Sequence, residues 1–563
     1  MTILTLIVLA GLVSQVVAGP VVQVLNGTYE GYNLPAYGQD VFLGMPYAQP
    51  PEGILRFRAP QSLNVTWNGV KPAVAYSDVC MQYVTPPGFP MSEDCLTLNV
   101  VRPSEMHNQS LPVAVWIHGG GLYSGSSAAT NLSNFVTQAT KTGKPLIAVS
   151  INYRLTAFGF LWGNSSDILT NGSANNGLRD QRLALQWIQE NIKFFGGDSS
   201  RVTIWGESSG ALSVGKHLIA YGGRDDNLFR AAIMESGSMV EKWPYNIKDP
   251  VAYTADLYRN LTETTGCSNK TGLPADTTPL ECLRALNIEA LSAALNVSHT
   301  PVFSGTGLGP WLTQVDGDIL KDGPTDSLDK GHFVNVPILY STNTDEATVF
   351  GFSGPVNSDE DFRAFVAAGG PDNATINIIE ILYPDVNAVG LPAGYEPTPE
   401  SESIYGKQWK REVAFHTDAV ETASRRKVLD TWAAAGGTAY STRINLLPLG
   451  QPAAIGSSHA VELAFVFNNV DGSGYNDELR STSALMSRVW ASFVSDLNPN
   501  HHKACGVPNW QAWNTTNSDG VGTNFVFNSN GTVGTSTTYL ELDDYRLAQT
   551  RYLNSIMETQ MYY

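Results

Sequence analysis

Between residues 100 and 240, apolar β-branched runs alternate with helical segments, and this alternation constrains the fold more than any other feature. The expected strands cover residues 112–117, 146–152, 201–205 and 231–234. The segment from Leu178 to Phe195 has apolar residues at helical spacing and ends at a Gly-Gly pair. Strands that are apolar on both faces and alternate with helices predict a mostly parallel, buried sheet flanked by helices.

The same pattern extends into the second half of the chain. Residues 336–340 and 438–445 are predicted to be later strands of this sheet, and residues 240–330 and 350–435 to be helical insertions that form the walls of a pocket. No repeat or long linker interrupts the pattern. We therefore expect residues 19–563 to form a single α/β domain, although the length alone would favour several.

The first 18 residues form a short apolar run that ends in small residues. Such a run is typical of a secretory signal peptide, cleaved here after Ala18 or Gly19. The chain also contains many Asn-X-Ser/Thr sequons, which accept N-glycans in exported proteins. The sequons begin at Asn26, Asn64, Asn108, Asn131, Asn164, Asn171, Asn260, Asn269, Asn296, Asn373, Asn514 and Asn530. We therefore expect a secreted, extracellular glycoprotein.

The charge of the chain argues against polyanionic partners. The net charge is −18, only 15% of the residues are charged, and no basic run occurs. Nothing in such a chain would neutralise phosphates, so neither nucleic acid nor an anionic membrane surface is an expected partner. Beyond the signal segment no apolar stretch is long enough to span a bilayer, which argues against integral membrane association.

The five cysteines form two close pairs and one remainder. Their spacing predicts the disulfides Cys80–Cys95 and Cys267–Cys282, with Cys505 as a buried thiol. Each bridge would close a short loop and stabilise the fold by about 3 kcal/mol in the chain-entropy model. Two disulfides agree with export.

A Gly-x-Ser-x-Gly motif, Gly206 to Gly210, directly follows the expected strand 201–205 and precedes a helical run that starts at Ala211. Small residues at both ends let the chain turn sharply, which exposes the hydroxyl of Ser208 above the sheet near a helix N-terminus. The motif by itself occurs by chance in long chains. Its strand-turn-helix placement predicts that Ser208 is a nucleophile.

A run of three glycines, His118-Gly-Gly-Gly121, follows the expected strand 112–117. Glycines let the backbone fold back, so the N–H groups of Gly120, Gly121 and Ser209 are expected to form an oxyanion hole. The run matches neither a G-x-G-x-x-G fingerprint nor a P-loop, which excludes phosphate binding. His118 itself is expected to be a structural residue of the loop.

A serine nucleophile needs a base, and His459 is the best placed of the nine histidines. It lies in a loop of small residues after the expected strand 438–445, late in the chain, as the order Ser-acid-His requires. The acid would follow the strand 336–340, where Asp345 and Glu346 are adjacent. Either carboxylate could orient the imidazole. The pattern alone does not choose between them.

The chain resembles the type-B carboxylesterase and lipase family, which includes cholinesterases and fungal lipases, over nearly its whole mature length. The resemblance rests on the segments Phe42–Ala48, Ser92–Asn99, His118–Gly121, Asn152–Leu155, Asn176–Trp187, Phe195–Asp198, Gly206–Gly210 and Glu235–Ser238. It implies an α/β-hydrolase fold with a Ser-His-Glu triad. In this family the acid is the glutamate of an Asp-Glu-Gly segment, which maps to Glu346, and the base maps to His459. Ser238 maps to a supporting position near the triad.

Departures from the family pattern leave every catalytic group in place. Ser209 replaces a more usual Ala but keeps its N–H, Ala347 replaces Gly after the acid, and Leu122 replaces an aromatic residue after the glycines. The loop enclosed by Cys80 and Cys95 is short, whereas the family's lipases carry a long lid there. It also has no Trp, which binds choline in cholinesterases. Both differences favour a general esterase.

These observations predict a carboxylic ester hydrolase that acts through an acyl-enzyme on short- to medium-chain esters. No metal or organic cofactor is expected, since no zinc-type spacing such as H-E-x-x-H occurs. The alternative is a lipase or sterol esterase acting on long-chain or lipid esters, for which residues 350–435 could supply an acyl tunnel. A non-catalytic adhesion-type relative is disfavoured, because such proteins lack the nucleophile and this chain has Ser208.

Overall fold

The computed structural model describes residues 19–83, 86–163, 166–171, 174–240, 250–268, 274, 277–298, 309–350, 355–516, 520–528 and 537–560. The predicted signal segment, residues 1–18, lies outside these ranges. The sequons that begin at Asn164, Asn269 and Asn530 lie outside them as well.

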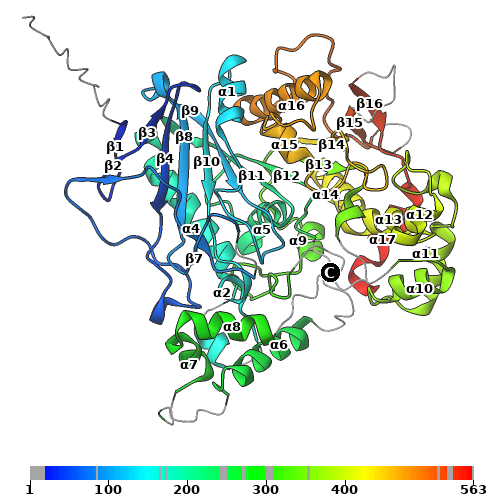
Figure 1. Cartoon of the computed structure of the whole chain (residues 1–563), viewed down its shortest axis with the longest axis horizontal. Helices are drawn as coiled ribbons and strands as arrows, with labels where there is room; N and C mark the ends of the chain where they lie inside the picture. The colour runs from blue at the N-terminus through cyan, green and yellow to red at the C-terminus, as the bar shows by residue number, and fades with distance from the viewer. Residues whose placement is uncertain are drawn as a thin grey trace, which may run out of the picture.

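A sheet of eleven strands runs through the molecule (Figure 1), in the order β16-β15-β14-β13-β12-β11-β9-β10-β8-β4-β3. All neighbours from β10 to β15 are parallel, and the strands outside that range pair antiparallel. The strands are β3 (Tyr32–Leu34), β4 (Gln39–Pro46), β8 (Thr97–Pro103), β9 (Leu111–Ile117), β10 (Ile147–Ile151), β11 (Gly197–Glu207), β12 (Ala231–Glu235), β13 (Ile338–Asn343), β14 (Ala439–Asn445), β15 (Thr523–Asn528) and β16 (Thr538–Leu542). The predicted mostly parallel sheet is confirmed.

Two smaller sheets lie beside the large one. The first joins β1 (Val21–Gln23), β2 (Thr28–Glu30) and β5 (Val70–Pro72). The second joins β6 (Val79–Cys80) and β7 (Met91–Ser92), the two ends of the loop that the first disulfide encloses. Sequence reasoning did not predict these short strands or the antiparallel strands at both edges of the large sheet.

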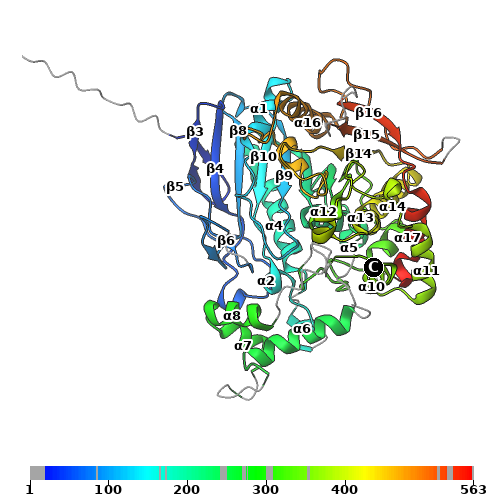
Figure 2. The ribbon, with the colours of Figure 1, turned by 45° about the vertical axis from the view of Figure 1, so that its right-hand side comes forward.

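Helices cover both faces of the large sheet (Figures 1 and 2). They are α1 (Ser133–Lys141), α2 (Thr156–Phe160), α3 (Ser166–Asn171), α4 (Asn176–Asn191), α5 (Ser209–Gly223), α6 (Pro250–Thr264), α7 (Pro279–Ala285), α8 (Ile288–Ser298), α9 (Pro324–Asp329), α10 (Asp359–Ala367), α11 (Asn373–Leu382), α12 (Pro399–Tyr405), α13 (Trp409–Thr417), α14 (Ala423–Ala434), α15 (Glu462–Val466), α16 (Asp477–Asp496) and α17 (Leu547–Gln560). Across the described part of the chain, none combines the length and apolar character needed to cross a membrane.

The strands are apolar on both faces because each face packs against its own layer of helices. In β9, Val113, Val115 and Ile117 belong to the core that contains α4, α5 and α14, whereas Ala114 and Trp116 belong to the core that contains α1 and α16. Side chains that alternate in this way along a strand give an uninterrupted apolar run in the sequence. This explains why the central strands could be predicted from apolar runs alone.

The helical insertions form two lobes. Helices α6, α7 and α8 extend below the sheet in Figures 1 and 2, and α10 to α13 gather with α17 on the right in Figure 1. The helices predicted within residues 240–330 and 350–435 are present where the chain is described. Both lobes arise after strands of the parallel part of the sheet, so they extend from its carboxyl edge.

The two predicted disulfides are formed, with Cα–Cα distances of 5.0 Å for Cys80–Cys95 and 5.5 Å for Cys267–Cys282. The prediction that Cys505 is a buried thiol is wrong, because this cysteine is free and exposed. It lies in the irregular segment between α16 and β15, which exposes residues 503, 505 and 506 at the surface. This part of the segment lies at the surface, so the tendency of free cysteines to be buried does not apply there.

Candidate active site

Ser208 stands at the turn between β11 and α5, with φ 57° and ψ −129°. A serine in this region is strained by about 1–3 kcal/mol, which the surrounding contacts must offset. A Cβ on Gly206 would lie 2.4 Å from the carbonyl carbon of Gly210, and a Cβ on Gly210 would lie 2.1 Å from the oxygen of Ile117. The turn therefore closes only with glycine at both positions. The amide of Ser208 donates to the carbonyl of Glu235 at 2.9 Å, which anchors the turn to β12.

The glycine loop after β9 lies against this turn. A Cβ on Gly119 would lie 3.0 Å from the Cβ of Ser208, and Gly120 and Gly121 have φ of 105° and 64°, which favour glycine. Among the described residues, no acceptor takes the N–H groups of Gly120, Gly121 or Ser209. These three amides therefore remain free to donate to an oxyanion beside Ser208.

Ser209 and His118 support the loop. The hydroxyl oxygen of Ser209 accepts from the amide of Leu122 at 3.2 Å, so the residue after Ser208 also holds the glycine loop. His118 stacks on Tyr153 at a centroid distance of 4.5 Å, and burial lowers its pKa to about 4. A neutral, stacked His118 agrees with the structural role that the sequence indicated.

Glu346 and His459 meet above the carboxyl ends of β13 and β14. The Nδ1 of His459 lies 2.8 Å from Oε2 of Glu346, which is fully buried. The other carboxylate oxygen, Oε1, accepts from the amide of Asn343 and from the hydroxyl of Ser236, both at 2.6 Å. Three hydrogen bonds therefore fix the carboxylate in the orientation that holds the imidazole.

Asp345, the other candidate acid, points to a different partner. Its Oδ2 accepts from the amide of Ser457 at 2.8 Å, and its own amide donates to the carbonyl of Ser457 at 2.9 Å. These bonds join the loop that carries Glu346 to the loop that carries His459. The geometry therefore separates two adjacent carboxylates that the sequence pattern could not.

The resemblance maps a supporting position to Ser238, but the serine that contacts Glu346 is Ser236. Ser238 is buried, accepts from the amide of Val240 at 3.1 Å, and has no described contact with Glu346 or His459. Ser236 instead donates to Glu346. The reason is local: Ser236 directly follows β12 and has φ 49°, so the chain turns there, beside the carboxyl end of the neighbouring β13, which leads to Glu346.

Glu207 is the residue of the site that sequence reasoning missed. Its Oε1 lies 3.3 Å from Nε2 of His459, so the imidazole stands between two carboxylates. Burial raises the pKa of Glu207 to about 7. The only signal for Glu207 in the sequence was its position immediately before Ser208.

Further buried carboxyls surround the pair. Burial raises the pKa of Glu462 to about 8 and raises the pKa values of Glu235 and Glu421 well above the usual range. Burial would lower the pKa of His459, but the neighbouring carboxylates of Glu207 and Glu346 raise it. The site is therefore built to stabilise an imidazolium ion. Within the described ranges, no three His, Cys, Asp or Glu side chains are grouped to hold a metal ion.

Comparison with known proteins gives consistent matches. The model of the "Carboxylesterase family" matches residues 18–533. "Lipase 5" of Diutina rugosa is 35% identical over 528 residues, which cover 87% of this chain and 89% of that protein. "Secreted lipase 1" of Botryotinia fuckeliana is 32% identical over 504 residues, covering 84% and 83%. The crystal structure of Aspergillus niger EstA superposes with a TM-score of 0.78 at 29% identity, over 97% of this chain and 99% of that one.

Proposed function

Because the chain belongs to the carboxylesterase family and is a carboxylic ester hydrolase, we propose that Ser208, His459 and Glu346 form its catalytic triad. The observation that carries the proposal is the 2.8 Å contact between His459 and Glu346, together with the strained turn at Ser208, whose preceding residue Glu207 lies 3.3 Å from Nε2 of His459. A nucleophile, a base and an acid that orients the base are the groups that acyl transfer requires.

The reaction proceeds in two steps. In the first, His459 takes the hydroxyl proton of Ser208, the serine oxygen bonds to the ester carbonyl carbon, and the carbonyl oxygen becomes an oxyanion. The N–H groups of Gly120, Gly121 and Ser209 donate to that oxyanion. The imidazolium then protonates the leaving alcohol, which leaves an acyl-enzyme. Water repeats these steps and releases the carboxylic acid.

The surrounding carboxylates stabilise the protonated form of His459. Glu346 accepts from Nδ1 of His459, and Glu207 lies within ion-pair distance of Nε2. The imidazolium that forms when Ser208 loses its proton therefore faces negative charge on both nitrogens. Low dielectric strengthens this stabilisation, because Glu207 and Glu346 are buried and the side chain of His459 is only 11% exposed.

We propose short- to medium-chain esters as substrates. The loop enclosed by Cys80 and Cys95 is tied to the glycine loop, because Gln82 exchanges two hydrogen bonds with Gly125 at 2.9 and 3.3 Å. A hydrogen bond from Trp311 to the hydroxyl of Tyr83 at 3.0 Å holds the next residue. Because this loop is short and anchored at these two residues, it favours an esterase that lacks a large mobile lid.

A lipase or sterol esterase is the second candidate. Relatives that match most of the chain bear the names Lipase 5 and Secreted lipase 1, which favours long-chain or lipid esters. Secreted lipase 1 also supports the proposal that this protein is secreted, together with the apolar segment at residues 1–18. Export would make the exposed sequon asparagines, such as Asn64 and Asn373, sites for N-glycans.

Hydrolysis of p-nitrophenyl esters from acetyl to palmitoyl tests both the mechanism and the substrate class. We expect preference for short chains and a fall in kcat on the order of 10⁴-fold or more in Ser208→Ala. Ser481→Ala, an exposed serine on α16, serves as the matched control and should keep full activity. Rates that rise with chain length above the micellar threshold would favour the lipase. Unchanged activity in Ser208→Ala would refute the proposed nucleophile.

A further inference from the structure

The glycine loop after β9 must hold its peptide groups in fixed directions, because the proposed oxyanion hole consists of backbone N–H groups. The carbonyl of Gly120 shares its peptide group with the N–H of Gly121. It accepts from the amides of Tyr123 and Ser124 at 3.1 and 2.9 Å, and from the hydroxyl of Ser124 at 3.0 Å. The loop therefore fixes this first peptide group with its own residues.

The next peptide group, between Gly121 and Leu122, is held from outside the loop. The carbonyl oxygen of Gly121 accepts from the amide of Gly309 at 2.9 Å, and within the described part of the chain it has no other donor. At the other end, the N–H of Leu122 donates to the hydroxyl oxygen of Ser209 at 3.2 Å. Two distant segments of the chain therefore fix the two ends of one peptide group.

This outside support matters because the loop has little conformational preference of its own. Only the two backbone dihedrals of Gly121 separate its N–H from the peptide group that Gly309 holds. Glycine is the residue whose dihedrals are least restricted, so the surrounding contacts decide where that N–H points. The bond from Gly309 is therefore coupled to the direction of a proposed oxyanion donor.

No side chain fits at Gly309. A Cβ built there would lie 2.8 Å from the Cβ of Tyr123 and 2.9 Å from its Cδ1. Carbon atoms that are not bonded to each other normally stay about 3.5–4.0 Å apart. The φ of Gly309 lies outside the left-handed region, so the close approach of the two segments explains the glycine, and backbone conformation does not.

The segment that begins at Gly309 is itself anchored to the loop that the disulfide Cys80–Cys95 encloses. Trp311 is 1% exposed, and its indole N–H donates to the hydroxyl of Tyr83 at 3.0 Å. The neighbouring Gln82 exchanges two hydrogen bonds with Gly125, at the far end of the glycine loop. The disulfide loop, the glycine loop and residues 309–311 therefore brace one another.

We propose that Gly309 is a positioning residue for the oxyanion hole. Its amide holds the carbonyl of Gly121, and its lack of a side chain lets the segment approach the glycine loop closely enough to form that bond. Gly309 acts through the glycine loop and not on the substrate. This role rests on the proposed function, because it requires that the amides of Gly120, Gly121 and Ser209 bind the oxyanion.

The substitution Gly309→Ala tests this role. The added methyl group forces the glycine loop and residues 309–311 apart, which disturbs the bond to Gly121. A misplacement of about 1 Å can cost on the order of 10²-fold, so kcat for p-nitrophenyl acetate should fall by about that factor, with KM changed less than about threefold. The matched control is Gly394→Ala, where an added Cβ meets no atom within 4 Å, and it should keep full activity.

Two further measurements separate positioning from a general loss of structure. The carbonyl carbon of 1,1,1-trifluoroacetone bonds to the hydroxyl oxygen of Ser208 and its carbonyl oxygen becomes an oxyanion, so its affinity should fall in parallel with kcat/KM. Ser209→Ala releases the other end of the peptide group that Gly309 holds. The losses of kcat in Ser209→Ala and Gly309→Ala should therefore not multiply in the double variant, as they would for independent sites.

Three results would contradict the role of Gly309. They are a folded Gly309→Ala enzyme with wild-type kcat, a variant in which only KM rises, and losses that multiply in the double variant. If Gly309→Ala does not fold, Tyr83→Phe removes the hydroxyl that anchors Trp311 and should lower kcat about two- to tenfold at unchanged KM. Wild-type kinetics in Tyr83→Phe would then overturn the proposal.

The variant Ser208→Ala, measured in parallel, distinguishes this role from the proposed function. Activity that survives in Ser208→Ala refutes the proposed nucleophile. An inactive Ser208→Ala enzyme beside a Gly309→Ala enzyme with wild-type kcat refutes only the positioning role of Gly309.

Discussion

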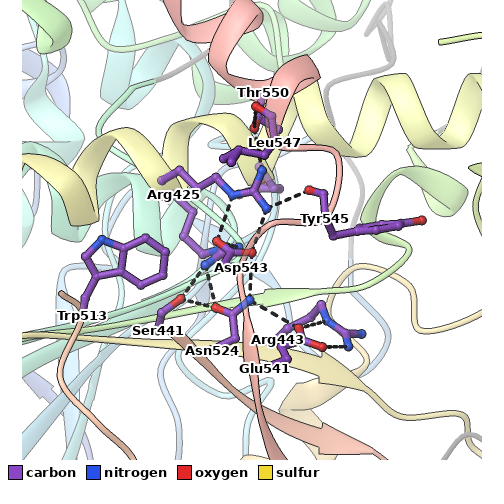
Figure 3. A network of polar contacts seen from close by, with 12 residues as sticks. Arg425, Ser441, Arg443, Trp513, Asn524, Glu541, Asp543, Tyr545, Leu547 and Thr550 are labelled. Atoms are coloured by element: carbon purple, nitrogen blue, oxygen red, sulfur yellow. Dashed lines mark hydrogen bonds and ion pairs between the residues drawn. The ribbon is translucent and has the colours of Figure 1, made fainter. Parts of the chain in front are cut away.

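Two buried groups of charged side chains lie in different parts of the large sheet, one around His459 and one around Asp543 (Figure 3), where β16 ends beside the start of β15, and their charges are balanced in opposite ways. Around His459, the carboxyls of Glu207, Glu235 and Glu462 have raised pKa values, because burial is not offset by enough positive charge. Around Asp543, burial would raise the pKa, but Arg425 and Arg426 lower it to about 2.

We interpret this difference as one between the proposed catalytic centre and a structural centre. A single imidazole among several buried carboxyls can gain and lose a proton with little rearrangement, which suits acid–base catalysis. Asp543, in contrast, is held ionised by two guanidinium groups. We therefore expect substitutions at the first centre to change rates, and substitutions at the second to change stability.

The largest effect is expected from Glu346→Gln. The glutamine amide can donate to Nδ1 of His459 and hold the wrong tautomer, so kcat should fall on the order of 10⁴-fold. The free energy of unfolding should change much less. The measurement is hydrolysis of p-nitrophenyl butyrate, and the matched control is the neighbouring substitution Asp345→Asn. A larger loss of kcat in Asp345→Asn than in Glu346→Gln would reverse the assignment of the acid.

The next effect is a loss of stability in Asp543→Asn. Removing this carboxylate leaves Arg425 and Arg426 buried without their counter-charge, which should cost about 3–5 kcal/mol of unfolding free energy. Denaturant unfolding measures this cost. Asp318→Asn removes an ion pair whose carboxylate is 62% exposed, so it should cost less than about 1 kcal/mol. Equal costs in the two variants would contradict the structural role of Asp543.

The lowered pKa of Asp543 also makes its contribution to the unfolding free energy depend on pH. Because the folded-state pKa is about 2 and the ordinary value is 3.8, Asp543 contributes stability that is present above the ordinary value. This contribution is lost as the pH falls toward about 2. Wild-type unfolding free energy should therefore fall more steeply over this interval than that of Asp543→Asn.

Glu207→Gln is expected to cause a smaller change, a shift in the pH dependence of kcat/KM. The charge of Glu207 helps to raise the pKa of His459, so its removal should let the imidazole lose its proton more readily. The acid limb of the kcat/KM profile should then move to lower pH. Glu235→Gln, another buried carboxyl that does not contact His459, is the control and should leave the limb in place. A shift to higher pH in Glu207→Gln would disprove the electrostatic role.

The smallest effect is expected from Ser209→Ala. The backbone N–H proposed for the oxyanion hole remains, and only the hydrogen bond from Leu122 to the serine hydroxyl is lost. A hydrogen bond of this kind contributes about 0.5–1.5 kcal/mol, so kcat should fall less than about tenfold. Steady-state kinetics on the butyrate ester measures this. A fall of several hundredfold would mean that the hydroxyl itself is part of the reaction.

The sequence was informative where backbone conformation and residue type are tightly linked. Central strands such as β9 were predicted because both faces are buried, and the turn at Ser208 because only glycine fits at Gly206 and Gly210. Edge strands such as β3 and β16 do not have this apolar pattern, because these strands are short and their side chains are partly exposed.

The parts that could not be predicted depend on contacts between distant segments. Glu207 and His459 are in contact although they lie far apart in the sequence, at the end of β11 and after β14. The contact of Ser236 with Glu346 depends on the pairing of β12 with β13. The Asp543 network joins α14, β15 and the turn after β16. No local pattern contains that information, because each member is an ordinary polar residue in its own segment.

The central claim is that the hydroxyl of Ser208 becomes acylated. The most direct measurement is reaction with diethyl p-nitrophenyl phosphate, which traps an activated serine, followed by peptide mass spectrometry. We predict one diethylphosphoryl group per chain, on the peptide that contains Ser208, with parallel loss of esterase activity. Labelling of a different residue, or full inhibition without any adduct on Ser208, would contradict the mechanism.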